Sequence, residues 1–151
     1  MKIQIKSRAD IEQTIFQPKT ALISITDYNY DFAELKNQPD SLLQIAFDDI
    51  DNDVFQDELG GKPTEAERKQ IEQKYHMLTD EQAEQIAEFY HTVCDKADIL
   101  ICQCEHGQSR SAAIAAAILE YKSKSGIKVF AHDDYYPNKT IYKKILRYLS
   151  K

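Results

Sequence analysis

One short segment of the 151-residue chain combines a thiol, a glycine and an arginine at close spacing. Cys104 is followed by Gly107, by Arg110 and immediately by Ser111, between the apolar stretch 99–102 and an alanine-rich run. This order predicts a buried strand, a loop and a helix. The backbone N–H groups of a loop that closes into a helix N-terminus converge on one spot, and they form an anion site the size of a phosphate.

Each side chain of this segment has a chemical use in such a loop. Gly107 allows a turn that other residues resist, and it leaves the loop interior free of a side chain. The planar guanidinium of Arg110 can bind two phosphate oxygens. The same positive potential would stabilise a thiolate at Cys104, and Ser111 can donate a hydrogen bond to that sulfur. The segment is therefore expected to hold a phosphate beside a nucleophile.

The pattern Cys104-x5-Arg110-Ser111 with Gly107 resembles the signature of the cysteine-based protein phosphatases, and it is most similar to their small dual-specificity branch. The resemblance is specific over residues 98–121. It implies a phosphomonoester hydrolase that forms a cysteinyl-phosphate and needs no metal or organic cofactor. It also implies a set of residues that bind the substrate phosphate through the loop, with their side chains around the pocket: Glu105, His106, Gly107, Gln108 and Ser109. Gln103 stands where the family usually has a histidine.

The family mechanism also implies an aspartic acid on a separate loop, which protonates the leaving group and then activates water. The segment Phe47-Asp48-Asp49-Ile50 follows an expected strand and is similar to the acid-bearing segment of such phosphatases. We assign the role to Asp49, with Asp48 as the alternative beside the substrate. A merely solvated acidic turn is the competing interpretation. Asp49 precedes Cys104 by 55 residues, which is longer than usual, and a helix expected over 64–75 accounts for the difference.

The elements around these residues alternate between strand and helix. Hydrophobic patterning predicts strands at 2–6, 21–26, 42–47, 99–102 and 127–130. Helices are expected over 8–16, 64–75, 80–95, from the loop to about 125 with Gly126 as its cap, and from Asn138 onward. Thr64 with Glu67 and Thr79 with Gln82 form capping-box patterns. The chain is expected to be one α/β domain over 1–151, with a mostly parallel sheet flanked by helices.

Composition excludes several classes of partner. There are 19 Lys and Arg against 25 Asp and Glu, a net charge of −6, which disfavours nucleic acid and anionic membranes. The charge also predicts that strongly acidic phosphopeptides are poorer substrates than neutral or basic ones. The expected partner is a phosphorylated protein or a small phosphomonoester, and the oligomeric state stays open, a monomer included. No signal peptide or membrane span is expected, and three cysteines favour reduced thiols and a cytoplasmic location.

Three other functions compete with the phosphatase hypothesis. The loop could bind phosphorylated partners without catalysis. It could also carry thiol chemistry such as sulfur transfer or arsenate reduction, with Cys94 or Cys102 as a second thiol. A zinc site would use residues at spacings that are unusual for zinc: His91, Cys94, Cys102, Cys104 and His106.

The aromatic residues of the 27–40 loop, Tyr28, Tyr30 and Phe32, are either a substrate rim or packing residues.

Overall fold

The computed structural model describes residues 1–151 and contains a four-stranded sheet in which every pairing is parallel. Its strands are β1 (Lys2–Lys6), β2 (Thr20–Thr26), β3 (Ser41–Ala46) and β4 (Ile99–Gln103), in the spatial order β1-β4-β2-β3. The central strands β2 and β4 are almost completely buried, which matches their continuous apolar sequences. The predicted α/β domain with a parallel sheet is confirmed.

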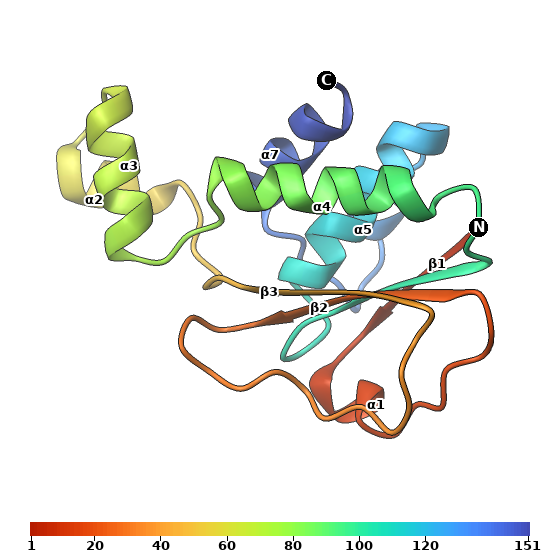
Figure 1. Cartoon of the computed structure of the whole chain (residues 1–151). Coiled ribbons are helices and arrows are strands. Elements are labelled where there is room, and N and C mark those ends of the chain that lie inside the picture. Colours follow the sequence, from red (N-terminus) through yellow and green to blue (C-terminus); the bar gives the residue numbers. More distant parts are fainter.

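Helices cover one face of the sheet, and irregular chain covers most of the other (Figure 1). The helical layer consists of α4 (Asp80–Val93), α5 (Arg110–Ser123) and α7 (Lys139–Leu149), which share a core of 22 buried residues with the sheet. The opposite face carries α1 (Arg8–Ile11) and the β2–β3 connection, around a smaller cluster that includes Ile11, Phe16 and Leu22. No helix has both the length and the apolar character needed to cross a membrane.

Two further helices, α2 (Asp53–Leu59) and α3 (Glu65–Lys74), lie together beyond the end of β3, at the left of Figure 1. The capping box of Thr64 and Glu67 starts α3 as predicted, and the box of Thr79 and Gln82 starts α4. Helix α2 was not predicted, because the acidic run before it resembles a solvated turn. The chain after α3 returns to the end of β3, where the N–H of Asp48 donates to the carbonyl of His76 at 2.8 Å.

The predicted strand over 127–130 is wrong, since this segment forms the helical turn α6 (Ile127–Phe130). Neither sheet edge takes it up, and Val129 instead packs on Ala112 and Ala116 of α5. Short-range bonds such as Lys128 N to Ser125 O close the turn.

Two helix ends also differ from the predictions. Helix α1 ends at Ile11 rather than Phe16, since Thr14 Oγ1 donates to Asp10 O at 2.7 Å and competes with the helical ladder. Lys124, with φ +56°, caps α5 in place of Gly126. Gly126 instead packs so closely on α5 that a Cβ would lie 2.6 Å from Ala116 O.

Candidate active site

The loop between β4 and α5 is fixed against the end of the neighbouring strand β1. Cys104 N donates to Lys6 O at 3.3 Å, and Arg8 N donates to Glu105 O at 3.1 Å. Gly107 has φ +67°, and a Cβ on it would lie 2.8 Å from the backbone of both Lys6 and Ser7. Glycine is therefore required at position 107 for its conformation and for the close approach of two backbones.

The backbone N–H groups of this loop after Cys104 have no hydrogen-bond acceptor within the protein. The six consecutive N–H groups of Glu105 through Arg110 donate to no acceptor in the protein. They lie where α5 begins at Arg110, and Ser109 makes no side-chain cap bond there. A 14-residue helix adds its positive end to the same spot. Six such donors in succession at a helix N-terminus leave this loop able to bind an anion.

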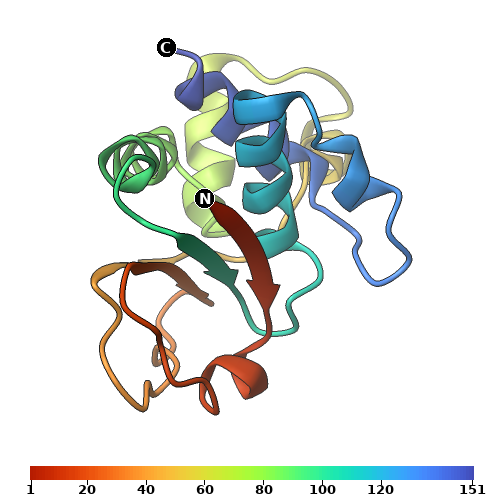
Figure 2. The same cartoon turned by 90° about the vertical axis from the view of Figure 1, so that its right-hand side faces the viewer.

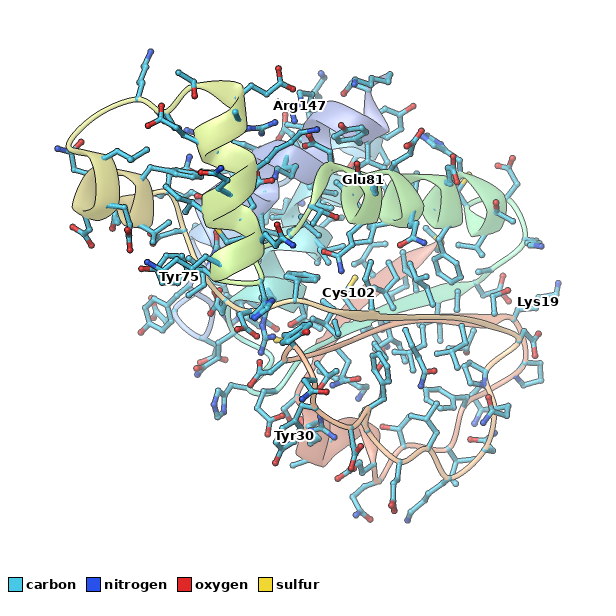
Figure 3. All side chains as sticks on the ribbon, turned by 60° about the vertical axis from the view of Figure 1, so that its left-hand side comes forward. Lys19, Tyr30, Tyr75, Glu81, Cys102 and Arg147 are labelled. Carbon is cyan, nitrogen blue, oxygen red and sulfur yellow. The ribbon has the colours of Figure 1, made fainter.

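The thiol of Cys104 lies at this cluster and contacts one side chain. Its Sγ is 3.0 Å from Ser111 Oγ, the pairing expected from the sequence. Cys104 is 2% exposed and Ser111 is fully buried. Cys102, two residues earlier, lies between the sheet and the helical layer (Figure 3). Burial, with a smaller contribution from Cys104, raises the pKa of Cys102 to about 12, so Cys102 stays a protonated thiol at neutral pH. No disulfide joins the three cysteines, and Cys94 is half-buried at the end of α4.

Arg110 is held on one side and free on the other. Its Nη1 donates to Phe47 O at 2.7 Å and lies 2.7 Å from Asp27 Oδ1. Its Nε and Nη2 have no partner in the protein. This leaves the two-pronged edge of the guanidinium available for phosphate oxygens. Sequence reasoning missed Asp27. Its position directly after β2 was a usable signal, because the carboxyl ends of parallel strands share one edge of the sheet.

Of the two candidate acids, Asp49 lies against the loop. Its Oδ1 accepts from Ser109 Oγ and from Asn138 Nδ2, each at 2.9 Å, while its Oδ2 accepts from no group in the protein. Asp48 has a different environment, since its Oδ1 accepts from Tyr28 N at 2.9 Å. A surface cavity of about 530 Å³ is lined by Asp49, Ser109 and Asn138, among others. The sequence identified Asn138 as a helix cap, which it is, but not as a partner of Asp49.

The side chain of Gln103 links β2 to the first residue of the loop. This side chain is fully buried, accepts from Ser24 Oγ and donates through Nε2 to Cys104 O at 3.1 Å. Position 103 is therefore occupied by an amide that accepts a hydrogen bond from Ser24 and donates one to Cys104.

The other residues predicted around the pocket are placed as follows. Glu105 accepts from Arg8 Nε at 2.7 Å, which ties its side chain to α1 rather than to the loop interior. His106 and Gln108 are exposed, and Gln108 O accepts from Tyr136 N. Tyr28 stacks on His76 with ring centres 3.5 Å apart, whereas Tyr30 lies near Arg8 on the α1 side of the sheet (Figure 3). No three His, Cys, Asp or Glu residues are placed to hold a metal ion, so the zinc alternative gains no support.

The sequence and the structure were each compared with those of known proteins, and only the structure gave a match. No family model and no curated protein matches the sequence. The structure is similar to the crystal structure of PTPMT1 in complex with PI(5)P, with a TM-score of 0.54 at 13% sequence identity. The match covers 99% of this chain and 90% of that one. PTPMT1 is a dual-specificity-type phosphatase, so the chain has a cysteine phosphatase-like fold.

Proposed function

We propose that the protein is a cysteine-dependent phosphomonoester hydrolase. The observation that carries the proposal is that all six N–H groups from Glu105 through Arg110, the residues directly after Cys104, have no acceptor in the protein, while Arg110 keeps a free guanidinium edge. An anion held there would be neutralised by backbone dipoles and one guanidinium, with a nucleophile beside it. The phosphatase-like fold supports the same function.

In the first step, the Cys104 thiolate attacks the phosphorus atom, a P–S bond forms and the bond from phosphorus to the ester oxygen breaks. Asp49 gives its proton to the departing oxygen. The loop N–H groups and Arg110 stabilise the charge on the transferring phosphoryl group. Ser111 Oγ, 3.0 Å from the sulfur, stabilises the thiolate.

In the second step, the Asp49 carboxylate takes a proton from water, whose oxygen attacks phosphorus. The P–S bond breaks, the Cys104 thiolate returns and inorganic phosphate leaves. The two hydrogen bonds to Asp49 Oδ1 leave Oδ2 as the atom that carries the proton in the first step and accepts it in the second. Asp49 is favoured over Asp48 because its carboxylate contacts the loop residue Ser109.

Hydrolysis of an aryl phosphate in the presence of EDTA tests this proposal. Wild-type protein should release phosphate, Cys104→Ser should not, and Cys102→Ser serves as the matched control with activity close to wild type. Full activity of Cys104→Ser would contradict the proposal. Phosphate or phosphopeptide binding without any turnover by the wild type would replace it with a non-catalytic phosphate-binding module.

A further inference from the structure

Strand β1 forms one edge of the sheet and borders an apolar groove. β1 pairs only with β4, and Figure 2 shows it as the dark red arrow with α5 above it. The groove has a volume of about 420 Å³. Its apolar lining comes from β1, α5, α6 and the segment after α6: Ile3, Ile5, Ala115, Leu119, Val129 and Tyr135.

The backbone along this edge is available for pairing. Lys2 N donates to Asp98 O at 2.8 Å, toward β4. Because backbone groups alternate in direction along a strand, the N–H and C=O of Ile3 and Ile5 point to the open edge. The side chains of Ile3 and Ile5 pack against the core on the groove side of the sheet. A segment added along β1 would therefore gain backbone hydrogen bonds and place alternate side chains in the groove.

Charge selects the occupant of this edge. Lys2 is exposed, and Lys6 and Lys128 line the groove, in a chain whose net charge is −6. None of these three lysines forms an ion pair within the protein. An antiparallel pairing of two β1 strands about Gln4 would put Lys2 of one copy opposite Lys6 of the other, and like charges in such positions repel. The lysines disfavour a second copy and favour an acidic strand at this edge. The net charge of −6 alone would make acidic segments poorer partners, but the three lysines lie beside the docked strand, where distant charges are screened.

The edge is also close to the proposed active site. The end of β1 supports the loop through Lys6 O and Cys104 N, 3.3 Å apart. A strand added to β1 would lie two strand spacings from β4, roughly 10 Å, a distance that about three extended residues span. A docked segment could therefore present a phosphorylated residue to the loop from the same chain.

We infer that the β1 edge docks an extended, acidic segment of the phosphoprotein substrate, with apolar side chains alternating with carboxylates. The substrate part of this inference rests on the proposed function, whereas the docking itself does not require catalysis.

A binding experiment tests the docking alone. A fluorescent peptide in which valine and glutamate alternate should bind wild-type protein about tenfold more tightly than a peptide in which valine and lysine alternate. Lys2→Glu with Lys128→Glu should abolish this preference. Lys36→Glu with Lys96→Glu, exposed lysines elsewhere with the same change in net charge, should keep it. Hydrogen exchange at the Ile3 and Ile5 amides should slow when the acidic peptide is present.

Each other outcome overturns the inference. Equal binding of the two peptides, equal effects of the two double variants, or unchanged exchange at Ile3 and Ile5 would each exclude acidic strand addition. A concentration-dependent dimer that protects the same amides would show that the occupant is a second copy. Turnover of a small aryl phosphate should be unaffected in both double variants, so its absence in the wild type would count against the proposed function and not against docking.

Discussion

The carboxylate of Asp27 lies 2.7 Å from Nη1 of Arg110 and shares that nitrogen with the carbonyl of Phe47. Asp27 follows β2 and Arg110 begins α5, so the pair joins two segments 83 positions apart at one edge of the sheet. The two contacts hold Nη1 of the guanidinium and leave Nε and Nη2 without a partner in the protein. We therefore expect Asp27 to position Arg110.

Replacing Asp27 by Ala should therefore raise KM and lower kcat/KM by about tenfold, because Arg110 loses a charged partner. Binding of inorganic phosphate should weaken in parallel, while Asp27→Asn, which keeps an acceptor oxygen, should recover part of the loss. Asp31→Ala, an exposed carboxylate on the same loop, is the control. Wild-type phosphate affinity in Asp27→Ala would show that Phe47 O alone positions Arg110.

The acid role of Asp49 predicts a dependence on the leaving group. Asp49→Asn should reduce kcat about 100-fold or more for alkyl phosphates, whose leaving oxygen needs a proton, and much less for aryl phosphates with acidic phenols. Asp48→Asn should show a small and uniform effect. A leaving-group dependence that appears in Asp48→Asn and not in Asp49→Asn would move the acid role to Asp48.

Gly107 and Gly60 have similar backbone conformations but different surroundings, so substituting each one separates the conformational cost from the cost of close packing. Both have positive φ, +67° and +69°, but a Cβ on Gly60 would meet nothing within 4 Å. Gly60→Ala should cost only the conformational penalty, about 1 kcal/mol, and keep activity. Gly107→Ala should lower the free energy of unfolding further and abolish hydrolysis, since Lys6 and Ser7 must move. Urea denaturation and aryl phosphate turnover measure both, and equal effects of the two substitutions would refute the close-packing argument.

Asp80 gives the fold a dependence on pH. Burial alone would raise the pKa of Asp80, but the nearby charges of Lys144, Arg68 and Arg147 outweigh it and lower that pKa below its usual value. The resulting stabilisation is present above the unfolded pKa, about 3.9, and is lost as the pH falls through the folded pKa. Asp80→Asn should thus lower the free energy of unfolding at pH 7, by about 1 kcal/mol, and have little effect near pH 2.

The control for Asp80 is Glu81→Gln, which removes an exposed carboxylate next to it and should leave the free energy of unfolding nearly unchanged at both pH values. Chemical denaturation at each pH provides the comparison. An Asp80→Asn penalty that persists undiminished at pH 2 would mean that the charge of Asp80 is not its source.

Local patterns were enough to predict most of the fold. The boxes of Thr64 and Thr79 lie within four residues of chain, and the apolar run of β4 signals burial without knowledge of its neighbours. The strand predicted at 127–130 failed because a four-residue segment with three apolar residues suits either a strand or a partly buried turn, and only the position of α5 decides between them.

The candidate site was also predictable only where its residues are neighbours in the sequence. The loop from Cys104 to Ser111 was predictable because its donors, glycine, arginine and hydroxyl are contiguous. The contact of Gln103 with Ser24 depends on the register of β2 against β4, which pairs these two residues. Asn138 and Asp49 are 89 positions apart, so their hydrogen bond follows from how α7 docks and not from any local pattern.

The central claim is that Cys104 becomes covalently phosphorylated. Wild-type protein or Asp49→Asn, mixed rapidly with an aryl phosphate and quenched in acid, can be digested and analysed by mass spectrometry. The account predicts one phosphate on the peptide that carries Cys104, at higher occupancy in Asp49→Asn, where hydrolysis of the intermediate is slowed. Phosphate release by the wild type with no phosphate on Cys104, or with the label on another residue, would contradict it.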